Sequence, residues 1–474
     1  MKLLKYTFQN TIRFSGRIVL MGCLALTALP SCSNFLDIGN PPDKITEDKI
    51  FKSDNTATAA MLSTYIDMMN DQFGSNGSFV CAAMSSQAGL SANELSYMGT
   101  GLTQPPFKQF NDHNLTPDNT YVQAFWRDGY KYIYRMNAIV SGLSTATGMS
   151  DAVKKQLEGE AKFMRAFCYF YLVNLFGDVP LVLNTSYQDN MLIPRTPSDK
   201  VWAQIISDLK DAKNLLTDTY VTAEHLRPNK WTATALLARA YLYTEKWQDA
   251  ENESNAVISS GVYSLQTVDK VFKKDSPETI WQLQPVRANT NTLEATLFLV
   301  TGVTQPTYQL TQNLLGSFEL NDKRKTNWVG FSNPNDLTWA YPAKYKATGA
   351  TVTEYYVVFR LAEQYFIRAE ARAQLSKITE GQSDVNLVRQ RAGISNISVS
   401  TKEALLQAIE QERKVEFFAE WGHRWLDLKR TKRTEAVLKP LSQSQTWKQG
   451  TELYPVPAHE LSANPKLVQN NAYL

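Results

Sequence analysis

Two glutamates, Glu416 and Glu420, stand four residues apart in a strongly helical stretch, which would place both carboxylates on one helix face. Paired carboxylates are what glycoside hydrolysis requires, one as the acid and the other as the base or nucleophile. The surrounding sequence supplies further charges: Arg413, Arg424, Asp427 and Arg430. Because so many opposite charges lie within reach, an ion-pair network explains the pair better than catalysis does. We therefore expect both glutamates to be structural.

Other chemical motifs are absent or incomplete in the sequence. The four histidines, His113, His225, His423 and His459, fall in no metal-ligand spacing, and no HExxH, GxSxG or phosphate-binding glycine loop occurs. Asp112, Asn114, Thr116 and Asp118 alternate like the ligands of a calcium loop, but Pro117 stands where that turn needs a glycine. A polar turn before the next helix is the better interpretation. We predict no enzyme, metal or cofactor.

Binding is a better-supported chemistry, because aromatic residues gather in two irregular, polar stretches, 71–119 and 264–353. Long stretches without regular periodicity are usually functional or mobile. A ring laid against the apolar face of a sugar, with amide, carboxylate or guanidinium groups at the hydroxyls, would bind a saccharide. The candidate ligand-binding residues are Tyr97, Phe107, Tyr308, Trp328, Trp339 and Tyr341, with Asn93 and Arg287 as candidate polar partners.

Each of these rings has an alternative place in the core. Trp328 fits the core and the surface equally well, and only its position in an irregular stretch favours binding. Trp231, Trp247 and Trp281 lie in helical or strand-like sequence, so we expect them to be packing residues. Cys81 and Cys168 are too few and too far apart for a disulfide framework or a zinc site, and we expect both to be structural.

Helices must position these stretches, since apolar residues recur at helical spacing over most of the remaining chain. The spacing predicts helices at 55–69, 121–143, 151–175 and 199–216. Gly177 and Pro180 should end the third helix, and Ser198 or Asp199 should cap the fourth. Further helices are predicted at 363–375, 381–392 and 402–421, whereas TIWQLQPV and EYYVVF are strand-like.

The segment from Trp231 to Tyr263 matches one unit of the tetratricopeptide pattern. Ala238 takes the small position of the first helix, Trp247 fills the turn and Ala250 takes the small position of the second helix. Small residues at these places let two antiparallel helices approach closely, and such a pair buries its outer face only against further pairs. The sequence therefore predicts a mainly helical fold of stacked helix pairs.

The N-terminus is typical of an export signal. Lys2, Lys5, Arg13 and Arg17 precede the apolar run 18–29, which is too short for the roughly 20 residues of a membrane-spanning helix. Cys32 follows a small residue at the end of this run, so we predict that residues 1–31 are a lipoprotein signal and that Cys32 is lipidated. An ordinary thiol beside a soluble cleavage site is the alternative.

Charge excludes one class of partner. Residues 1–31 hold four of the 49 lysines and arginines and none of the 46 acidic residues, so the remainder has a formal charge of −1. Without a basic excess there is no compositional case for a nucleic-acid partner.

Several motifs occur in the order found in one known family. They are SCSNFLDIGNPPDKITEDKIF, WRDGYKYIYRMNAIV, GEAKFMRAFCYFYLVNLFGDVPLV, ELNDKR, FRLAEQYFIRAEARA, DVNLVRQRAG, IEQERKVEFFAEWGHRWLDLKR and LYPVPAHELSANPKLVQNNAY. Over nearly the whole chain the sequence resembles the SusD/RagB family of outer-membrane lipoproteins of Bacteroidetes. The resemblance implies a SusD-like fold of tetratricopeptide-like helix pairs that carry a loop-rich ligand face with a few short strands.

The resemblance also implies a function. Such a protein would be a non-enzymatic, surface-exposed lid that binds a glycan and delivers it to a SusC-like TonB-dependent β-barrel transporter. Residues 1–31 would be the signal, 32–263 the N-terminal half with the first binding loop, and 264–474 the C-terminal half with the second loop-rich region. Capture of a peptide, a scaffolding role and a surface hydrolase remain as alternatives. No binding residue carries over from a family motif.

Overall fold

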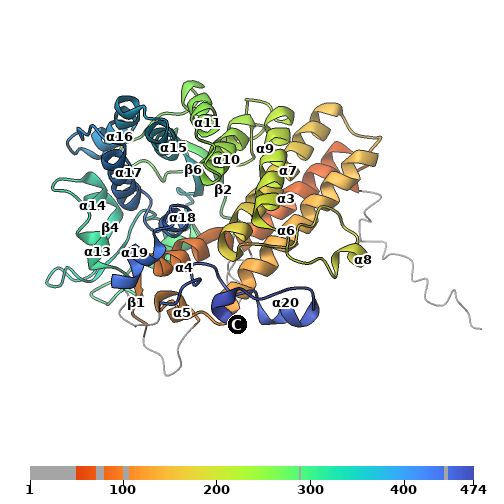
Figure 1. The fold of residues 1–474 in the computed structure, drawn as a ribbon. Coiled ribbons are helices and arrows are strands. Elements are labelled where there is room, and N and C mark those ends of the chain that lie inside the picture. The colour runs from red at the N-terminus through yellow and green to blue at the C-terminus, as the bar shows by residue number, and fades with distance from the viewer. Residues whose placement is uncertain (1–49, 71–78, 100–105, 288–289, 442–446) are drawn as a thin grey trace, which may run out of the picture. The chain divides into compact units, whose positions relative to one another are not determined.

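A computed structural model describes residues 50–70, 79–99, 106–287, 290–441 and 447–474. Residues 50–474 form one compact unit, in which helices dominate (Figure 1). The predicted signal and Cys32 lie outside the described residues. No helix in the described ranges has the length and apolarity needed to cross a membrane.

The larger helices are α3 (Asp54–Asn70), α4 (Met84–Ser91), α6 (Thr120–Thr145), α7 (Asp151–Phe176), α9 (Ser198–Leu215), α10 (Lys230–Tyr243), α11 (Trp247–Ser259), α15 (Leu361–Gln374), α16 (Ile378–Ala392), α17 (Lys402–Glu416) and α18 (His423–Arg430). Shorter segments are η4 (Phe79–Ala83), α5 (Lys108–Asn111), α8 (Tyr187–Asn190), η5 (Ala223–His225), α12 (Leu293–Phe298), α13 (Gln312–Leu315), α14 (Lys323–Trp328), α19 (Thr434–Leu438), η6 (Lys439–Leu441), α20 (Ala458–Ala463) and η7 (Asn471–Tyr473). The strands are β1 (Leu95–Tyr97), β2 (Thr279–Leu283), β3 (Tyr308–Leu310), β4 (Val329–Phe331), β5 (Ala340–Pro342) and β6 (Tyr356–Arg360).

The long helices lie where the apolar spacing of the sequence predicts them, and local capping explains most of their ends. Asn119 and Ser150 accept hydrogen bonds from the first turns of α6 and α7, and α7 ends at Gly177, whose φ is +76°. The predicted cap of α9 is wrong: Ser198 is already helical, and its backbone and hydroxyl both donate to Asp178, 2.8 and 2.6 Å away.

Successive helices stack in antiparallel pairs, as the tetratricopeptide match predicts. α10 packs on α11, α11 on α15, and α15 on α16, while α9 joins this series to α7 and α6 (Figure 1). Ala238 and Ala250 are fully buried between the helices. Arg239 and Glu363 form a buried, two-bond ion pair between α10 and α15, with both distances 2.6 Å, so charge pairing as well as apolar burial connects the repeats.

The α17 helix ends five residues earlier than predicted. The chain leaves the helix after Glu416 and turns through Ala419, Trp421 and Gly422, all at positive φ, before α18 begins. Trp421 is nevertheless buried and donates from Nε1 to the carbonyl of Val357, 2.8 Å away. A turn built on alanine and tryptophan at positive φ carries no sequence signal of the kind that glycine or asparagine gives.

The two strand-like runs pair with each other, since β2 and β6 form an antiparallel two-stranded sheet. Both strands are buried along their length. The first irregular stretch, by contrast, contains more regular structure than its sequence indicates: α4 is a helix whose eight residues are all buried. Its polar side chains have partners, because Ser86 Oγ donates to the Ala82 carbonyl at 2.6 Å and Ser91 Oγ lies 3.1 Å from the Tyr454 hydroxyl.

Candidate ligand-binding face

Strands β1 and β3 bring together rings from both irregular stretches. They pair antiparallel, with Tyr97 opposite Tyr308. The Tyr97 ring centroid lies 4.2 Å from that of Phe107 and 5.7 Å from that of Tyr308, and the Phe107 centroid lies 6.0 Å from that of Tyr121 on α6. Tyr97, Phe107, Tyr121 and Tyr308 are called the four-ring cluster below.

Exposure divides the four-ring cluster into a base and a surface. Tyr308 is buried beneath the others, whereas Tyr97, Phe107 and Tyr121 are partly exposed. Burial raises the pKa of the Tyr97, Tyr121 and Tyr308 hydroxyls, so all three stay neutral hydrogen-bonding groups at physiological pH. Buried Tyr308 thus supports the rings that face solvent.

The β4–β5 hairpin carries the second group of rings. Gly330 pairs with Tyr341, and a Cβ at Gly330 would come within 2.3 Å of the Tyr341 ring. Only glycine therefore lets the ring lie flat across the neighbouring strand. Trp339 and Tyr341 are partly exposed, and Phe331 at the end of β4 is 38% exposed.

The two groups lie on neighbouring strands. Strand β3 contacts β5, the Gln309 side chain donates to the carbonyl of Thr338, and Ser332 Oγ donates to the carbonyl of Thr304, 2.6 Å away. In Figure 1, β1 and β4 lie at the same end of the fold as α5 and α13. We call five of the exposed or partly exposed rings of these two groups the aromatic face: Tyr97, Phe107, Phe331, Trp339 and Tyr341.

Trp328, by contrast, is an interior residue. Its side chain is 1% exposed, and its Nε1 donates to the carbonyl of Val268, 2.9 Å away. Lys344, Arg391 and Arg360 surround the ring within 4.8 to 5.9 Å, so the indole is a partner for buried cations. The expectation that Trp328 contacts a ligand therefore does not fit its position. Trp281 is fully buried, as expected of a packing residue.

The expected polar partners lie apart from each other. Asn93 adjoins β1, and its carbonyl accepts a hydrogen bond from Thr311 Oγ1 at 2.8 Å. Arg287 is exposed on the segment between β2 and α12. Sequence reasoning missed Phe331, and it missed Gln309 on β3 and Gln305, whose side chain donates to that of Gln309 at 3.3 Å. Nothing in their sequence context distinguishes them from other loop residues.

The acidic pair is structural, with partners different from those expected. Glu416 is fully buried and accepts hydrogen bonds from Arg360 at 2.6 Å and Arg324 at 3.1 Å, besides contacting Arg391. Glu420, beyond the end of α17, pairs with Arg360 and Lys344. Neither carboxylate is free to act on a substrate.

The calcium-like motif and the cysteine in α7 also have structural explanations. Asp112 pairs with Lys108, and the chain turns into α6 through the Asn119 cap, in line with the polar-turn interpretation. Among the residues that the structure describes, no group of three or more histidine, cysteine, aspartate or glutamate side chains could hold a metal. Burial raises the pKa of the Cys168 thiol, which keeps it in the inert thiol form.

Comparison with known proteins gives a consistent result along the chain. Residues 43–242 match a family model described as SusD-like, starch-binding and associating with the outer membrane, and residues 320–473 match the model of the SusD family. A SusD-like protein of Formosa agariphila is 27% identical, covering 94% of this chain and 97% of its own length. Another from Bacteroides ovatus is 25% identical over 68% of each chain.

Solved structures match the fold. A SusD superfamily protein from Bacteroides vulgatus superposes with a TM-score of 0.77 at 21% identity, covering 90% of this chain and 100% of its own. Surface glycan-binding protein A from Bacteroides thetaiotaomicron, solved in complex with laminarihexaose, gives a TM-score of 0.76 at 19% identity, covering 88% and 100%. At such identities the likeness establishes the SusD-like fold alone.

Proposed function

Because the chain belongs to the SusD family of outer-membrane-associated proteins, which bind without catalysis, we propose that it captures a glycan on its aromatic face for import. The glycan would pass to a SusC-like TonB-dependent β-barrel, on which this protein would act as a lid. The observation that carries the proposal is the set of partly exposed rings on neighbouring strands, with Tyr308 buried beneath them.

The chemistry of the face suits a sugar chain. Rings of this kind cover the apolar C–H face of a pyranose, and at about 25 cal/mol per Å² one well-placed ring contributes about 1 kcal/mol or more. The amides of Gln309, on β3, and Gln305 bond to each other, and their remaining donors and acceptors can take sugar hydroxyls. Two structural neighbours support this ligand class by their own ligands: a laminarin-binding SusD-like protein and the glycan-binding protein solved with laminarihexaose.

We predict that Trp339→Ala and Tyr341→Ala each weaken glycan binding about tenfold, because each removes a ring worth about 1.4 kcal/mol at the sugar face. Calorimetry against a panel of glycans and peptides would measure the affinities and identify the ligand class. Melting temperatures should stay close to that of the parent, since both rings are only partly buried.

Tyr134→Ala is the matched control, because this tyrosine is 54% exposed on α6 and should leave affinity unchanged. If both hairpin variants bind as the parent does, or lose affinity only in step with stability, the aromatic face is not the binding site. Binding to peptides and to no glycan would favour the peptide-capture alternative, and binding to neither would favour a scaffold.

We further propose that the protein is held at the cell surface by lipid on Cys32. The residues that carry this prediction lie outside the described part of the chain. Cys32→Ala should move the protein from the membrane fraction to the soluble fraction, because a diacyl or triacyl anchor supplies about 0.8 kcal/mol per buried methylene. Fractionation in cells lacking the partner barrel is the measurement. Unchanged membrane retention there would contradict lipidation at Cys32.

A further inference from the structure

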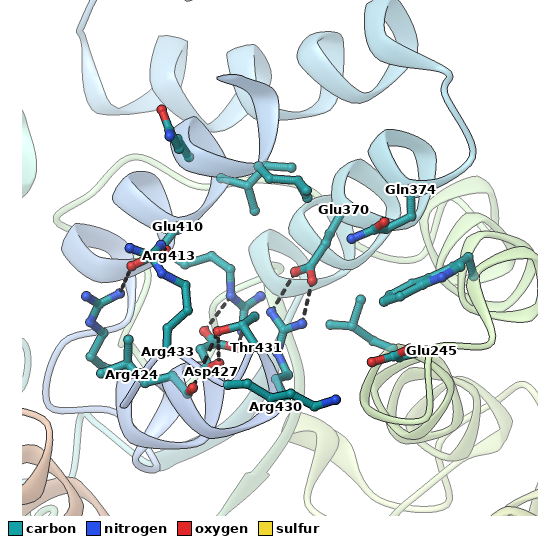
Figure 2. A pocket seen from close by; sticks show the side chains of 17 residues that line it. Glu245, Glu370, Gln374, Glu410, Arg413, Arg424, Asp427, Arg430, Thr431 and Arg433 are labelled. Atoms are coloured by element: carbon teal, nitrogen blue, oxygen red, sulfur yellow. Dashed lines mark hydrogen bonds and ion pairs between the residues drawn. The ribbon is translucent and has the colours of Figure 1, made fainter. Parts of the chain in front are cut away.

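A cavity of about 430 Å³ lies among the helix pairs, away from the aromatic face. Its walls come from the α10–α11 turn, the second half of α15, α17, and α18 with the residues that follow it (Figure 2). No described residue of β1, β3, β4 or β5 lines it. The volume falls within the range of small-molecule sites.

The lining combines an apolar surface with charges. Leu242, Ile409 and Leu428 are buried, and Trp247, partly exposed, stands at the α10–α11 turn beside Glu245. In Figure 2, Arg413, Arg424 and Arg433 lie on one side of the cavity, while Glu245 and Gln374 lie on the opposite side. Glu410 and Asp427 lie beside the three arginines, so this end of the cavity has a small excess of positive charge, and we call it the cationic end. The opposite end offers hydrogen-bond acceptors.

Two of the arginines, Arg430 and Arg413, pair with carboxylates in the lining. Arg430 pairs with both oxygens of Glu370 and donates to Asp427 at 2.7 Å, and Arg413 pairs with Asp427 at 2.7 and 3.1 Å. Arg413 still keeps one buried nitrogen, Nη1, without a hydrogen-bond partner among the described residues. A buried donor without a partner is costly, which favours an acceptor from a ligand or water.

The cationic end continues into a cleft of about 250 Å³, where positive charge exceeds negative charge. The cleft shares Glu410, Arg424 and Arg433 with the cavity and adds Lys414. Glu410 accepts a hydrogen bond from Arg424 at 2.9 Å and also contacts Arg433, while Lys414 Nζ donates to the Asn313 side chain at 2.6 Å. Three cations thus face a single carboxylate in the described lining.

Two effects lower the pKa of Lys414, burial first and a neighbouring cation second. Burial, and then the charge of Arg424, lower the pKa of Lys414 to about 8, against the opposing effect of Glu94. Burial likewise lowers the pKa of Arg424. An anion bound between these side chains would relieve their mutual repulsion and accept charge-assisted hydrogen bonds.

We propose that the cavity and its cleft form a second binding site, for a saccharide unit that carries an anionic group, either a carboxylate or a sulfate. The anionic group would lie between Arg424, Arg433 and Lys414. The sugar ring would cover the apolar lining near Trp247, and its hydroxyls would donate to Glu245 at the opposite end. This site goes beyond the proposed function, because it shares no lining residue with the aromatic face.

A peptide fits this site less well than a compact sugar. Peptides bind by adding a strand to a sheet edge, or by laying a helix along an extended apolar groove. The described lining consists of helices and the turns between them, so it offers no strand edge, and its apolar residues are interrupted by charged side chains on every wall. A cavity of this size with one cationic end favours a short, ring-shaped anion.

Calorimetry on the full chain can separate the contribution of ligand charge to affinity from that of ligand shape. Trigalacturonate should bind the parent protein, whereas its fully methyl-esterified form, which has a similar shape and no charge, should bind at least about tenfold more weakly. A sulfated galactan trisaccharide and its desulfated counterpart test the other anion in the same way. Binding of both charged sugars should weaken as salt is added.

Two variants locate the site. Arg433→Gln, at a side chain 46% exposed, and Lys414→Gln should each weaken binding of the charged sugar about tenfold without changing the melting temperature. Arg135→Gln is the matched control, because Arg135 also holds one partly exposed ion pair, with Asp67 on α3, and should bind as the parent does.

Three results would overturn the proposal: equal binding of the charged and esterified sugars, tighter binding of a pentaglutamate peptide, or parent-like affinity in both variants. Trp339→Ala distinguishes this site from the aromatic face. It should leave the anionic sugar bound, so loss of that binding in Trp339→Ala, but not in Arg433→Gln, would refute the second site and leave the proposed function intact.

Discussion

Glu416→Gln is expected to lower the free energy of unfolding by roughly 3–5 kcal/mol, the usual cost of breaking a buried ion pair by removing one partner. Burial alone would raise the pKa of Glu416, but the charges of Arg391, Arg360 and Arg324 together outweigh it and hold the pKa far below its ordinary value. The carboxylate is therefore ionised in the folded protein. A glutamine would leave three buried guanidinium groups with one negative charge fewer.

Urea denaturation measures this loss, and glycan binding measured well below the melting temperature should stay unchanged. Glu435→Gln is the matched control. Glu435 forms an ion pair with Lys439, and the two side chains are 53% and 60% exposed, so the pair contributes little to stability. Unchanged stability in Glu416→Gln would contradict the structural role. Release of product from a bound glycan, abolished in this variant, would contradict a function in binding alone.

Glu94→Gln is expected to make the protein more stable by several kcal/mol at pH 8, with little change at pH 4. Glu94 is 1% exposed, and its side-chain carboxyl accepts a hydrogen bond from the backbone N–H of Ala419 at 3.2 Å. Burial raises the pKa of Glu94 from 4.5 to about 8, although the Ala419 amide and the charge of Lys344 act in the opposite direction. The folded protein thus keeps Glu94 protonated at neutral pH.

The sign of the effect follows from linkage between protonation and folding. Between pH 4.5 and about 8 the unfolded chain releases the Glu94 proton while the folded chain keeps it, so the parent loses stability as pH rises, by about 1.4 kcal/mol per unit. Glutamine resembles the neutral acid and does not titrate. Stability measured in urea at pH 4 and pH 8 tests the difference between variant and parent.

Glu403→Gln, on the exposed face of α17, is the control for replacing a glutamate by glutamine. A pH-independent difference between Glu94→Gln and the parent would contradict protonation of the buried carboxyl. Glu294, whose pKa burial raises to about 7, titrates in both proteins, so its contribution cancels in the comparison.

The sequence predicted the long helices well because their signals are local. Apolar spacing depends on a few neighbouring residues, and it places α6, α7 and α9 within two residues of their observed ends. The helix α4 escaped prediction, because MSSQAGLS lacks an apolar stripe. It is buried through hydrogen bonds of its serines, including one to Tyr454 near the other end of the chain.

The candidate site was located only as two stretches of sequence, because exposure depends on distant packing. Trp328 and Trp339 both occur in irregular sequence rich in polar residues. The Trp328 ring is buried, where its Nε1 donates to the carbonyl of Val268 and Lys344 lies over its face. The Trp339 ring remains partly exposed on the β4–β5 hairpin. Those partners come from other segments, so no local pattern separates the two tryptophans.

The pairing of β1 with β3 also determines when the aromatic face can form. Leu95 meets Leu310, and the buried Glu94 meets Ala419, 325 residues later in the chain. Helix pairs such as α10–α11 close short loops and can form as soon as their own residues are available, but contacts across hundreds of residues must first overcome a large loop-closure entropy. We therefore expect pairs of helices that are neighbours in the sequence to form before the aromatic face. In a chain that forms from its N-terminus, the helices from α6 to α11 would be able to pair before residues 308–342, which complete the aromatic face, are available.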